Sequence, residues 1–129
     1  MTGLGILLAH LAGDYLLQSD WMANEKTRRW WPAWAHALTY GLPYVVVTRS
    51  PVALAAIVVS HAVIDHYRLA RHVVWVKNLV APSAYRYPWV ECSVTGYHRD
   101  RPMWMTVWLM IIADNTLHLL VNVGAVRWL

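Results

Sequence analysis

A single cysteine, Cys92, occurs in the 129 residues, so the chain can form neither an intramolecular disulfide nor a thiolate-rich metal site. Phenylalanine is absent, whereas tryptophan occurs nine times, often near the ends of apolar stretches. Tryptophan favours the membrane–water boundary, which accommodates both its ring and its N–H group. Charged residues make up only 14% of the chain, against about a quarter in soluble domains. This composition favours a membrane protein.

Four apolar stretches, residues 3–17, 33–48, 52–67 and 103–123, divide the chain. A helix needs roughly 20 residues to cross a bilayer, and only the last stretch is comfortably long enough. A soluble helical bundle is the alternative, but the near absence of a polar face on these stretches argues against it. We therefore predict one transmembrane domain over residues 1–129. It is an all-α, polytopic membrane bundle of four main helices, with short interfacial helices in the loop before the last span.

Most basic residues fall in the two longer connections between these stretches. They are Lys26, Arg28, Arg29, Arg68, Arg71, Lys77, Arg86, Arg99 and Arg101. If the four stretches cross a membrane, the other side of the membrane would carry only Arg49 and Arg127. The positive-inside rule then predicts a multi-pass protein of a cytoplasmic membrane with an extracytoplasmic N-terminus. Contact with anionic lipid headgroups accounts for the net charge of +4, so the bilayer is the expected partner and no nucleic acid is required.

Three histidine–aspartate pairs, each four residues apart, lie inside the apolar stretches. They are His10 and Asp14, His61 and Asp65, and Asp114 and His118. Residues four apart share one helix face, so each pair offers two metal ligands in one direction. The order is reversed in the last pair. If that helix runs antiparallel to the other two, the histidines form one layer and the aspartates another, and His36 can join from the remaining helix.

These seven side chains suit zinc, manganese or iron, with zinc or manganese preferred, because histidine and aspartate are their usual ligands. Seven candidates allow either two ions or one ion with aspartates that hydrogen-bond the ligating histidines. The alternative is that each pair is only a hydrogen bond between helices. Ionisable residues within a membrane are costly and usually functional, so three pairs together favour a metal site.

Three further polar residues extend the pattern as candidate catalytic residues. Gln18 lies one turn after Asp14 and would orient a water or the substrate. Lys26 and Arg68 follow the first and third apolar stretches and would bind a phosphate group. The alternative for these two cations is that they anchor the ends of spans at the interface.

Residues 71–102 form the longest connection between apolar stretches. Within it, the sequence VVWVKNLV predicts a short interfacial helix, and the prolines and glycine elsewhere predict loop. Long connections in small proteins are often functional, so this segment is a candidate lid or partner surface.

The motifs AHLAGDYLLQSDWMANEK, SHAVIDHYR and IADNTLHLL, with the His36 segment, resemble those of small membrane proteins grouped as domain of unknown function 3307, found in bacteria and phages. In the first motif His10, Asp14, Gln18 and Lys26 all match. Arg68 stands where lysine is more usual, and Asn115 where glutamine is. The family is distantly similar to bacterial inner-membrane proteins described as metal-dependent hydrolases, which implies that activity and location.

Three functions remain open at this point. The leading hypothesis is a membrane-embedded, metal-dependent hydrolase that acts on a phosphate-bearing or lipid-linked substrate at the cytoplasmic face. The second is a metal-ion transporter or channel, which with four spans would need a homodimer to build a path. The third is a metal-stabilised interaction protein, such as a phage factor that excludes rival phages by binding a host membrane protein.

Overall fold

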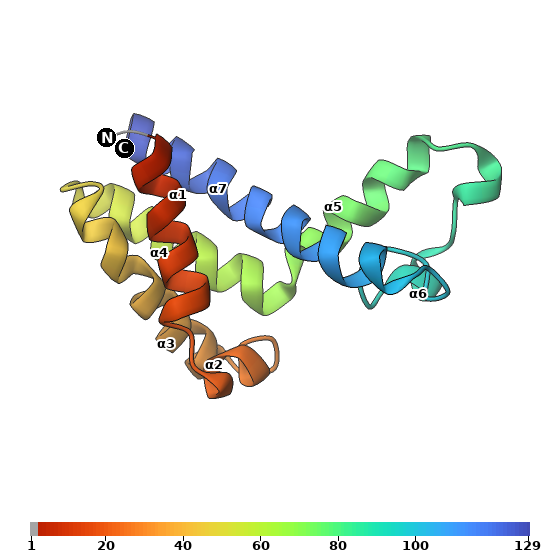
Figure 1. The fold of residues 1–129 in the computed structure, drawn as a ribbon, viewed down its shortest axis with the longest axis horizontal. Helices are drawn as coiled ribbons and strands as arrows, with labels where there is room; N and C mark the ends of the chain where they lie inside the picture. Colours follow the sequence, from red (N-terminus) through yellow and green to blue (C-terminus); the bar gives the residue numbers. More distant parts are fainter. Residues whose placement is uncertain (1–2) are drawn as a thin grey trace. The chain divides into compact units, whose positions relative to one another are not determined.

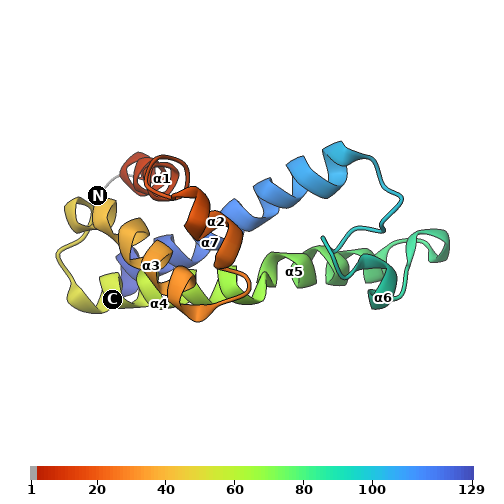
Figure 2. The same cartoon turned by 90° about the horizontal axis from the view of Figure 1, so that it is seen from below.

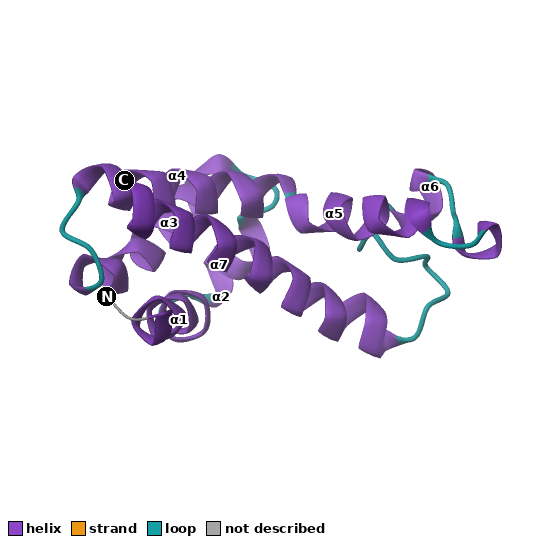
Figure 3. Ribbon diagram, turned by 90° about the horizontal axis from the view of Figure 1, so that it is seen from above, coloured by secondary structure: helices purple, strands orange, loops and turns teal. Residues whose placement is uncertain are grey.

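The computed structural model describes residues 3–129, in which helices joined by loops are the regular structure and no strand occurs (Figure 3). The chain divides into two compact units. The first unit comprises the described residues up to Tyr67 together with His118–Leu129, and the second unit is Arg68–Leu117. The all-α prediction is confirmed.

The first unit begins with α1 (Gly3–Leu11), which continues into one turn of π-helix (Ala12–Leu16). The short α2 (Asp20–Glu25) then leads into α3 (Trp30–Gly41), which ends in a 3-10 turn, Leu42–Val46 (Figure 2). Ser19 caps α2 by accepting a hydrogen bond from the Met22 amide. The helix α4 (Pro51–Tyr67) starts at a proline, whose fixed φ suits the first turn of a helix.

The final helix, α7 (Met110–Trp128), contributes its C-terminal part to the first unit (Figure 1). The core of this unit is apolar and includes Ile6 of α1 and Ile57 of α4. Two tyrosines, Tyr40 and Tyr44, are also fully buried there. Buried tyrosine needs a partner for its hydroxyl group, and the unit supplies one from α7.

The second unit contains α5 (Leu69–Lys77), 3-10 turns at Asn78–Val80 and Ser83–Tyr85, the short α6 (Trp89–Cys92) and the start of the last helix, which opens with a π-helical segment, Trp104–Leu109. The helix predicted for VVWVKNLV, residues 73–80, overlaps the second half of α5 and the 3-10 turn after it, and its interfacial location stays a prediction. Gly96 has φ +85°, and a side chain there would meet the Arg71 carbonyl, so the turn after α6 requires glycine. Burial raises the pKa of the Cys92 thiol, so this cysteine stays protonated.

Among residues 3–129, one helix meets the length and composition needed to cross a membrane. It spans Trp104–Trp128, 25 residues with a mean hydropathy of 1.5, and only 17% of its most apolar window is buried. A soluble core helix would be mostly buried, so the low burial favours contact with lipid. The segments Pro51–Tyr67 and Leu69–Val80 qualify only if taken together as a broken span, and Gly3–Leu16 is shorter. The structure thus supports membrane association, while the four spans and the single domain stay predictions.

Gly13 sets the approach of the π turn to α3. A β-carbon at this position would lie 3.1 Å from the Tyr40 α-carbon, which belongs to the backbone and cannot rotate away. We expect Gly13→Ala to lower the free energy of unfolding by about 1–3 kcal/mol, the usual cost of overpacking. Thermal unfolding in detergent measures this. Gly3→Ala is the matched control because nothing lies within 4 Å of its β-carbon, and equal melting temperatures for the two variants would contradict the close approach.

Candidate metal centre

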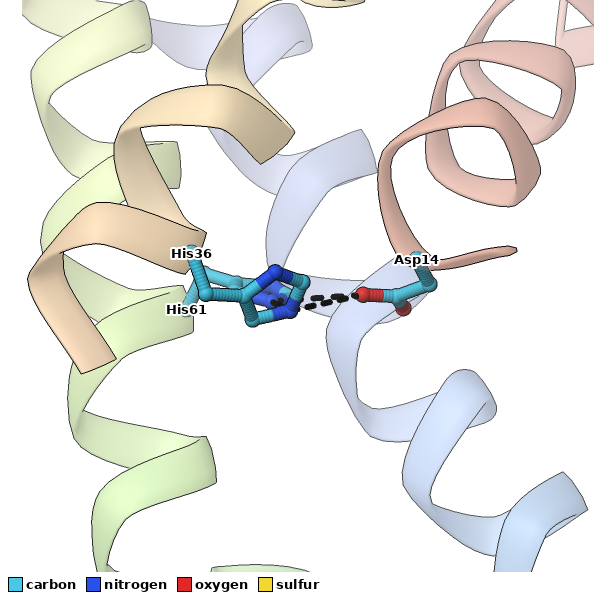
Figure 4. Close-up of side chains that lie close together, drawn as sticks. All are labelled: Asp14, His36 and His61. Atoms are coloured by element: carbon cyan, nitrogen blue, oxygen red, sulfur yellow. Dashed lines mark hydrogen bonds and ion pairs between the residues drawn. The ribbon is translucent and has the colours of Figure 1, made fainter. Parts of the chain in front are cut away.

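Two histidines and one aspartate from three separate segments converge in the first unit (Figure 4). His36 lies on α3, His61 on α4, and Asp14 in the π turn after α1. The two Nε2 atoms of the histidines are 2.9 Å apart. Asp14 Oδ1 lies 3.2 Å from His36 Nε2 and 3.4 Å from His61 Nε2. The three potential ligand atoms therefore form a compact triangle.

The size of this triangle fits a divalent ion. Four nitrogen or oxygen ligands arranged tetrahedrally at about 2.0–2.1 Å from zinc are separated from one another by about 3.3 Å. The three sides of 2.9, 3.2 and 3.4 Å match one face of such a tetrahedron. Neutral imidazole and carboxylate are ligands that zinc and manganese both accept. The residues present thus suit either metal, with three positions supplied by the protein.

Burial makes this cluster costly without a cation. His36 and His61 are 0% and 1% exposed, and Asp14 is 12% exposed. Asp14 Oδ1 is buried and accepts no hydrogen bond from residues 3–129, because its two histidine contacts lack hydrogen-bond geometry. Its polar neighbours are the two histidine Nε2 atoms at 3.2 and 3.4 Å, and a buried carboxylate oxygen that accepts no hydrogen bond is costly. A metal ion would satisfy it, and this observation is the strongest sign of a binding site.

Asp65 forms a second triangle with the same two histidines. Its Oδ2 lies 3.3 Å from His36 Nε2 and 3.2 Å from His61 Nε2. However, the same oxygen is only 2.7 Å from Lys26 Nζ, which is 18% exposed. Each imidazole Nε2 can bind one ion, so the two triangles cannot both be filled at once. The ammonium group of Lys26 competes for Asp65, which leaves Asp14 as the carboxylate ligand.

His118 brings α7 to the cluster through Asp65. Its Nε2 lies 3.2 Å from Asp65 Oδ1, and its ring centroid is 4.2 Å from that of His61. His61, Asp65 and His118 form a second group whose candidate ligand atoms lie within 4.8 Å of one another. Lys26 holds the other Asp65 oxygen. We therefore interpret His118 and Asp65 as residues that contact His61 and fix its orientation without binding the ion themselves.

A buried hydrogen-bond network lies beside the cluster. His10 Nδ1 is 3.5 Å from Asp14 Oδ2 and 2.8 Å from the Tyr40 hydroxyl. Asn122 donates to the hydroxyls of Tyr40 and Tyr44, at 2.5 and 2.8 Å. Tyr44 in turn donates to the Ile6 carbonyl at 3.2 Å. His10 therefore positions Asp14 rather than completing the triangle.

The sequence analysis missed Tyr40, Tyr44 and Asn122, although a signal was present. Tyr40 lies four residues after His36, Tyr44 lies four further on, and Asn122 lies four after His118. The spacing that joined histidine to aspartate places these residues on the same helix faces. They were overlooked because tyrosine and asparagine are poor metal ligands.

The remaining predicted site residues lie elsewhere. Gln18 donates from its side chain to the Asp14 carbonyl, at 3.3 Å, and so braces the π turn. Asp114 and Arg68 belong to the second unit. The Arg68 guanidinium donates to the Val94 carbonyl at 2.7 Å, and burial together with Arg71 lowers the pKa of Arg68 from its ordinary value. The structure gathers His10, Asp14, His36, His61, Asp65, His118 and Lys26 in one unit.

Comparison with known proteins gives a family and no named relative. The family described as protein of unknown function (DUF3307) matches residues 4–125 of the chain. No curated protein and no solved structure matches it. All of the clustered side chains fall within the matched range.

Proposed function

The chain belongs to the DUF3307 family, and we propose that it is a membrane-embedded, metal-dependent hydrolase of a phosphate-bearing or lipid-linked substrate. Asp14, His36 and His61 hold one divalent ion, zinc or manganese. The observation that carries the proposal is the buried triangle of ligand atoms with sides of 2.9–3.4 Å, one corner of which is an Asp14 oxygen that accepts no hydrogen bond from the described residues.

Three protein ligands rather than four favour catalysis over a structural role. Structural zinc sites are usually closed by four protein ligands, whereas catalytic sites keep one position for water or substrate. Here Lys26 occupies Asp65, so the fourth position is left to a non-protein group. Asp14 and Lys26 are also the most exposed members of the cluster, at 12% and 18%, which marks the side from which a substrate would enter.

The side chains around the triangle divide the work of hydrolysis. A divalent ion bound there lowers the pKa of water and polarises a phosphoryl oxygen. Asp65 contacts Lys26 through one oxygen and His118 through the other, so it holds Lys26 beside the two ligating histidines. Lys26 has N–H groups beyond the one directed at Asp65, and these offer a phosphate group a positive partner. His10 and Gln18 hold Asp14 in position.

The membrane supplies the class of substrate. The apolar helix Trp104–Trp128 favours residence in a bilayer, where a lipid-linked phosphate is the natural substrate for a buried centre. We place the substrate at the cytoplasmic face, with an extracytoplasmic N-terminus, because the basic residues concentrate in the two longer connections. Four spans in a bacterial inner membrane remain part of this proposal.

Hydrolysis of a panel of lipid phosphates and nucleotides by the detergent-purified chain, loaded with zinc or manganese, tests the proposal. We expect turnover that depends on the metal. Lys26→Met should lower the rate at least about tenfold, as loss of a charged contact to phosphate predicts, while the metal content stays unchanged. Lys77→Met, in the second unit, is the matched control. Absence of turnover with every substrate at full metal occupancy would refute the hydrolase.

The hydrogen-bond network beside the cluster favours a second candidate, a metal-ion or proton transporter. From Asp14 a buried polar chain runs through His10, Tyr40 and Tyr44 to the Ile6 carbonyl. Such chains are also found along ion paths in membranes. Metal flux into proteoliposomes that is lost in Tyr40→Phe, by a chain that forms a homodimer, would support transport over hydrolysis.

A further inference from the structure

The second unit contains a cavity of about 60 Å³, separate from the metal centre and lined only by residues of this unit. Its wall is built from α5 and its 3-10 extension, the loops on either side of α6 and the start of the last helix. Trp75 and three tyrosines make the wall aromatic, and Arg86 and Arg101 add positive charge. No aspartate or glutamate lines it.

Two tyrosine hydroxyls in this wall already accept a hydrogen bond from a cation. Arg101 donates to the Tyr87 hydroxyl at 2.7 Å, and Lys77 donates to the Tyr97 hydroxyl at 3.0 Å. Neither hydroxyl donates to any of the residues 3–129. A hydroxyl that accepts a hydrogen bond from a cation retains its own hydrogen, and the cation polarises its O–H bond. Both tyrosine hydroxyls can therefore donate a hydrogen bond to a ligand.

Arg101 is held in place but keeps most of its hydrogen-bonding capacity. Its guanidinium carbon lies 5.7 Å from the ring centroid of Tyr85 and 5.4 Å from that of Tyr87, and these cation–π contacts hold the group beside both rings. A guanidinium has five N–H donors. Within the described part of the chain, the Arg101 side chain uses one of them, in its hydrogen bond to Tyr87. Within residues 3–129, Arg86 likewise donates only through Nε, to the Ala81 carbonyl.

Acceptors, by contrast, are scarce around the cavity. His98 lines the cavity, but both of its ring nitrogens are engaged, because Nε2 donates to Glu91 at 2.8 Å and Nδ1 accepts from the Asp100 amide. Asn78 contributes one side-chain amide, whose NH2 group donates and whose oxygen is the one neutral side-chain carbonyl of the wall. Cys92 and Met105 contribute only sulfur. The cavity is therefore rich in donors and poor in acceptors, the chemistry that selects an anion.

We propose that this cavity binds the phosphate group of an anionic ligand, with Arg101 as the principal contact and Arg86, Tyr87 and Tyr97 as further donors. Planar guanidinium groups bind phosphate oxygens in pairs, which a fixed Arg101 is prepared to do. The volume, about twice the ~30 Å³ that one water occupies in the liquid, suits a phosphate group and not a whole headgroup. The site does not depend on the proposed hydrolase.

Calorimetric titration of the full chain in phospholipid-free detergent with inorganic phosphate, at constant ionic strength, tests the site. We expect saturable binding, weakened about tenfold or more in Arg101→Gln, as loss of a charged hydrogen bond predicts. Arg99→Gln is the matched control. Arg99 lies two residues before Arg101 and carries the same charge, but its side chain does not line the cavity, so this variant should leave the affinity unchanged. Tyr97→Phe removes one hydroxyl and little else, so it should weaken binding several-fold even if Arg101→Gln disturbs folding.

The source of the phosphate is separated by repeating the titration in nanodiscs. Loss of the phosphate signal in phosphatidylglycerol nanodiscs, with retention in phosphatidylcholine nanodiscs, would identify an anionic lipid headgroup as the ligand. Retention in both would identify free phosphate. The proposal is overturned if wild type shows no saturable phosphate binding in detergent, or if Arg101→Gln and Tyr97→Phe both bind as tightly as wild type.

Discussion

His61→Ala is expected to abolish stoichiometric metal binding. His61 Nε2 stands at a corner of both ligand triangles, 3.4 Å from Asp14 Oδ1 and 3.2 Å from Asp65 Oδ2, so its loss removes a ligand from each triangle. Removal of groups that merely support a ligand already weakens metal binding about 10–100-fold, and loss of a ligand itself should exceed that. Elemental analysis of detergent-purified protein, together with a competition titration against a chelator, measures both content and affinity.

Two further variants make this result specific. His61→Gln keeps most of the side-chain volume, so it should lose the metal while the fold persists. His72→Ala removes an exposed histidine of the second unit that stacks on Trp89, and its metal content should equal that of wild type. Equal metal content in wild type, His61→Ala and His61→Gln would show that the triangle of Asp14, His36 and His61 is not the metal site.

Asn122→Ala should destabilise the first unit by about 2–4 kcal/mol. The Asn122 amide is 1% exposed and donates to both tyrosine hydroxyls, at 2.5 Å for Tyr40 and 2.8 Å for Tyr44. Its removal leaves two buried hydroxyls short of a donor, at about 1–3 kcal/mol each, partly offset by local rearrangement. Denaturant-induced unfolding in detergent measures the loss.

A mutant cycle distinguishes this hydrogen-bond loss from simple loss of volume. In a Tyr40→Phe, Tyr44→Phe background the hydroxyls are gone, and removing all partners of a network is far cheaper than removing one. Asn122→Ala should then cost at least about 1 kcal/mol less than in wild type. The same cost in both backgrounds would mean that Asn122 acts only by filling space.

The sequence predicted the helices and most of the cluster because both follow from short-range rules. The predicted stretch 52–67 corresponds to α4, Pro51–Tyr67, within one residue at its start. Spacing of four residues placed Asp14 beside His10, at 3.5 Å, and Asp65 beside His61, at 3.2 Å. His36 was predicted to join from the remaining helix, and it lies 2.9 Å from His61.

Features that depend on tertiary packing could not be read in the same way. Spacing alone makes Asp14 and Asp65 equivalent candidate ligands. In the structure Lys26, 39 residues before Asp65, donates a hydrogen bond to one Asp65 oxygen, and no local spacing reveals this contact. The π turn at Asp14 arises where Gly13 meets the backbone of Tyr40, another long-range contact. Arg68 was assigned to phosphate, whereas its guanidinium binds the Val94 carbonyl after α6.

Zinc K-edge X-ray absorption of the zinc-loaded, detergent-purified chain tests the central claim most directly. The triangle predicts about one ion per chain, bound only by nitrogen and oxygen at about 2.0–2.1 Å, with the outer-shell scattering of two imidazoles. The His72→Ala variant, which alters an exposed side chain of the second unit, should give the same shell. Folded protein that takes up no stoichiometric zinc, or zinc without imidazole scattering, would contradict the claim and leave the cluster as a buried network of ion pairs.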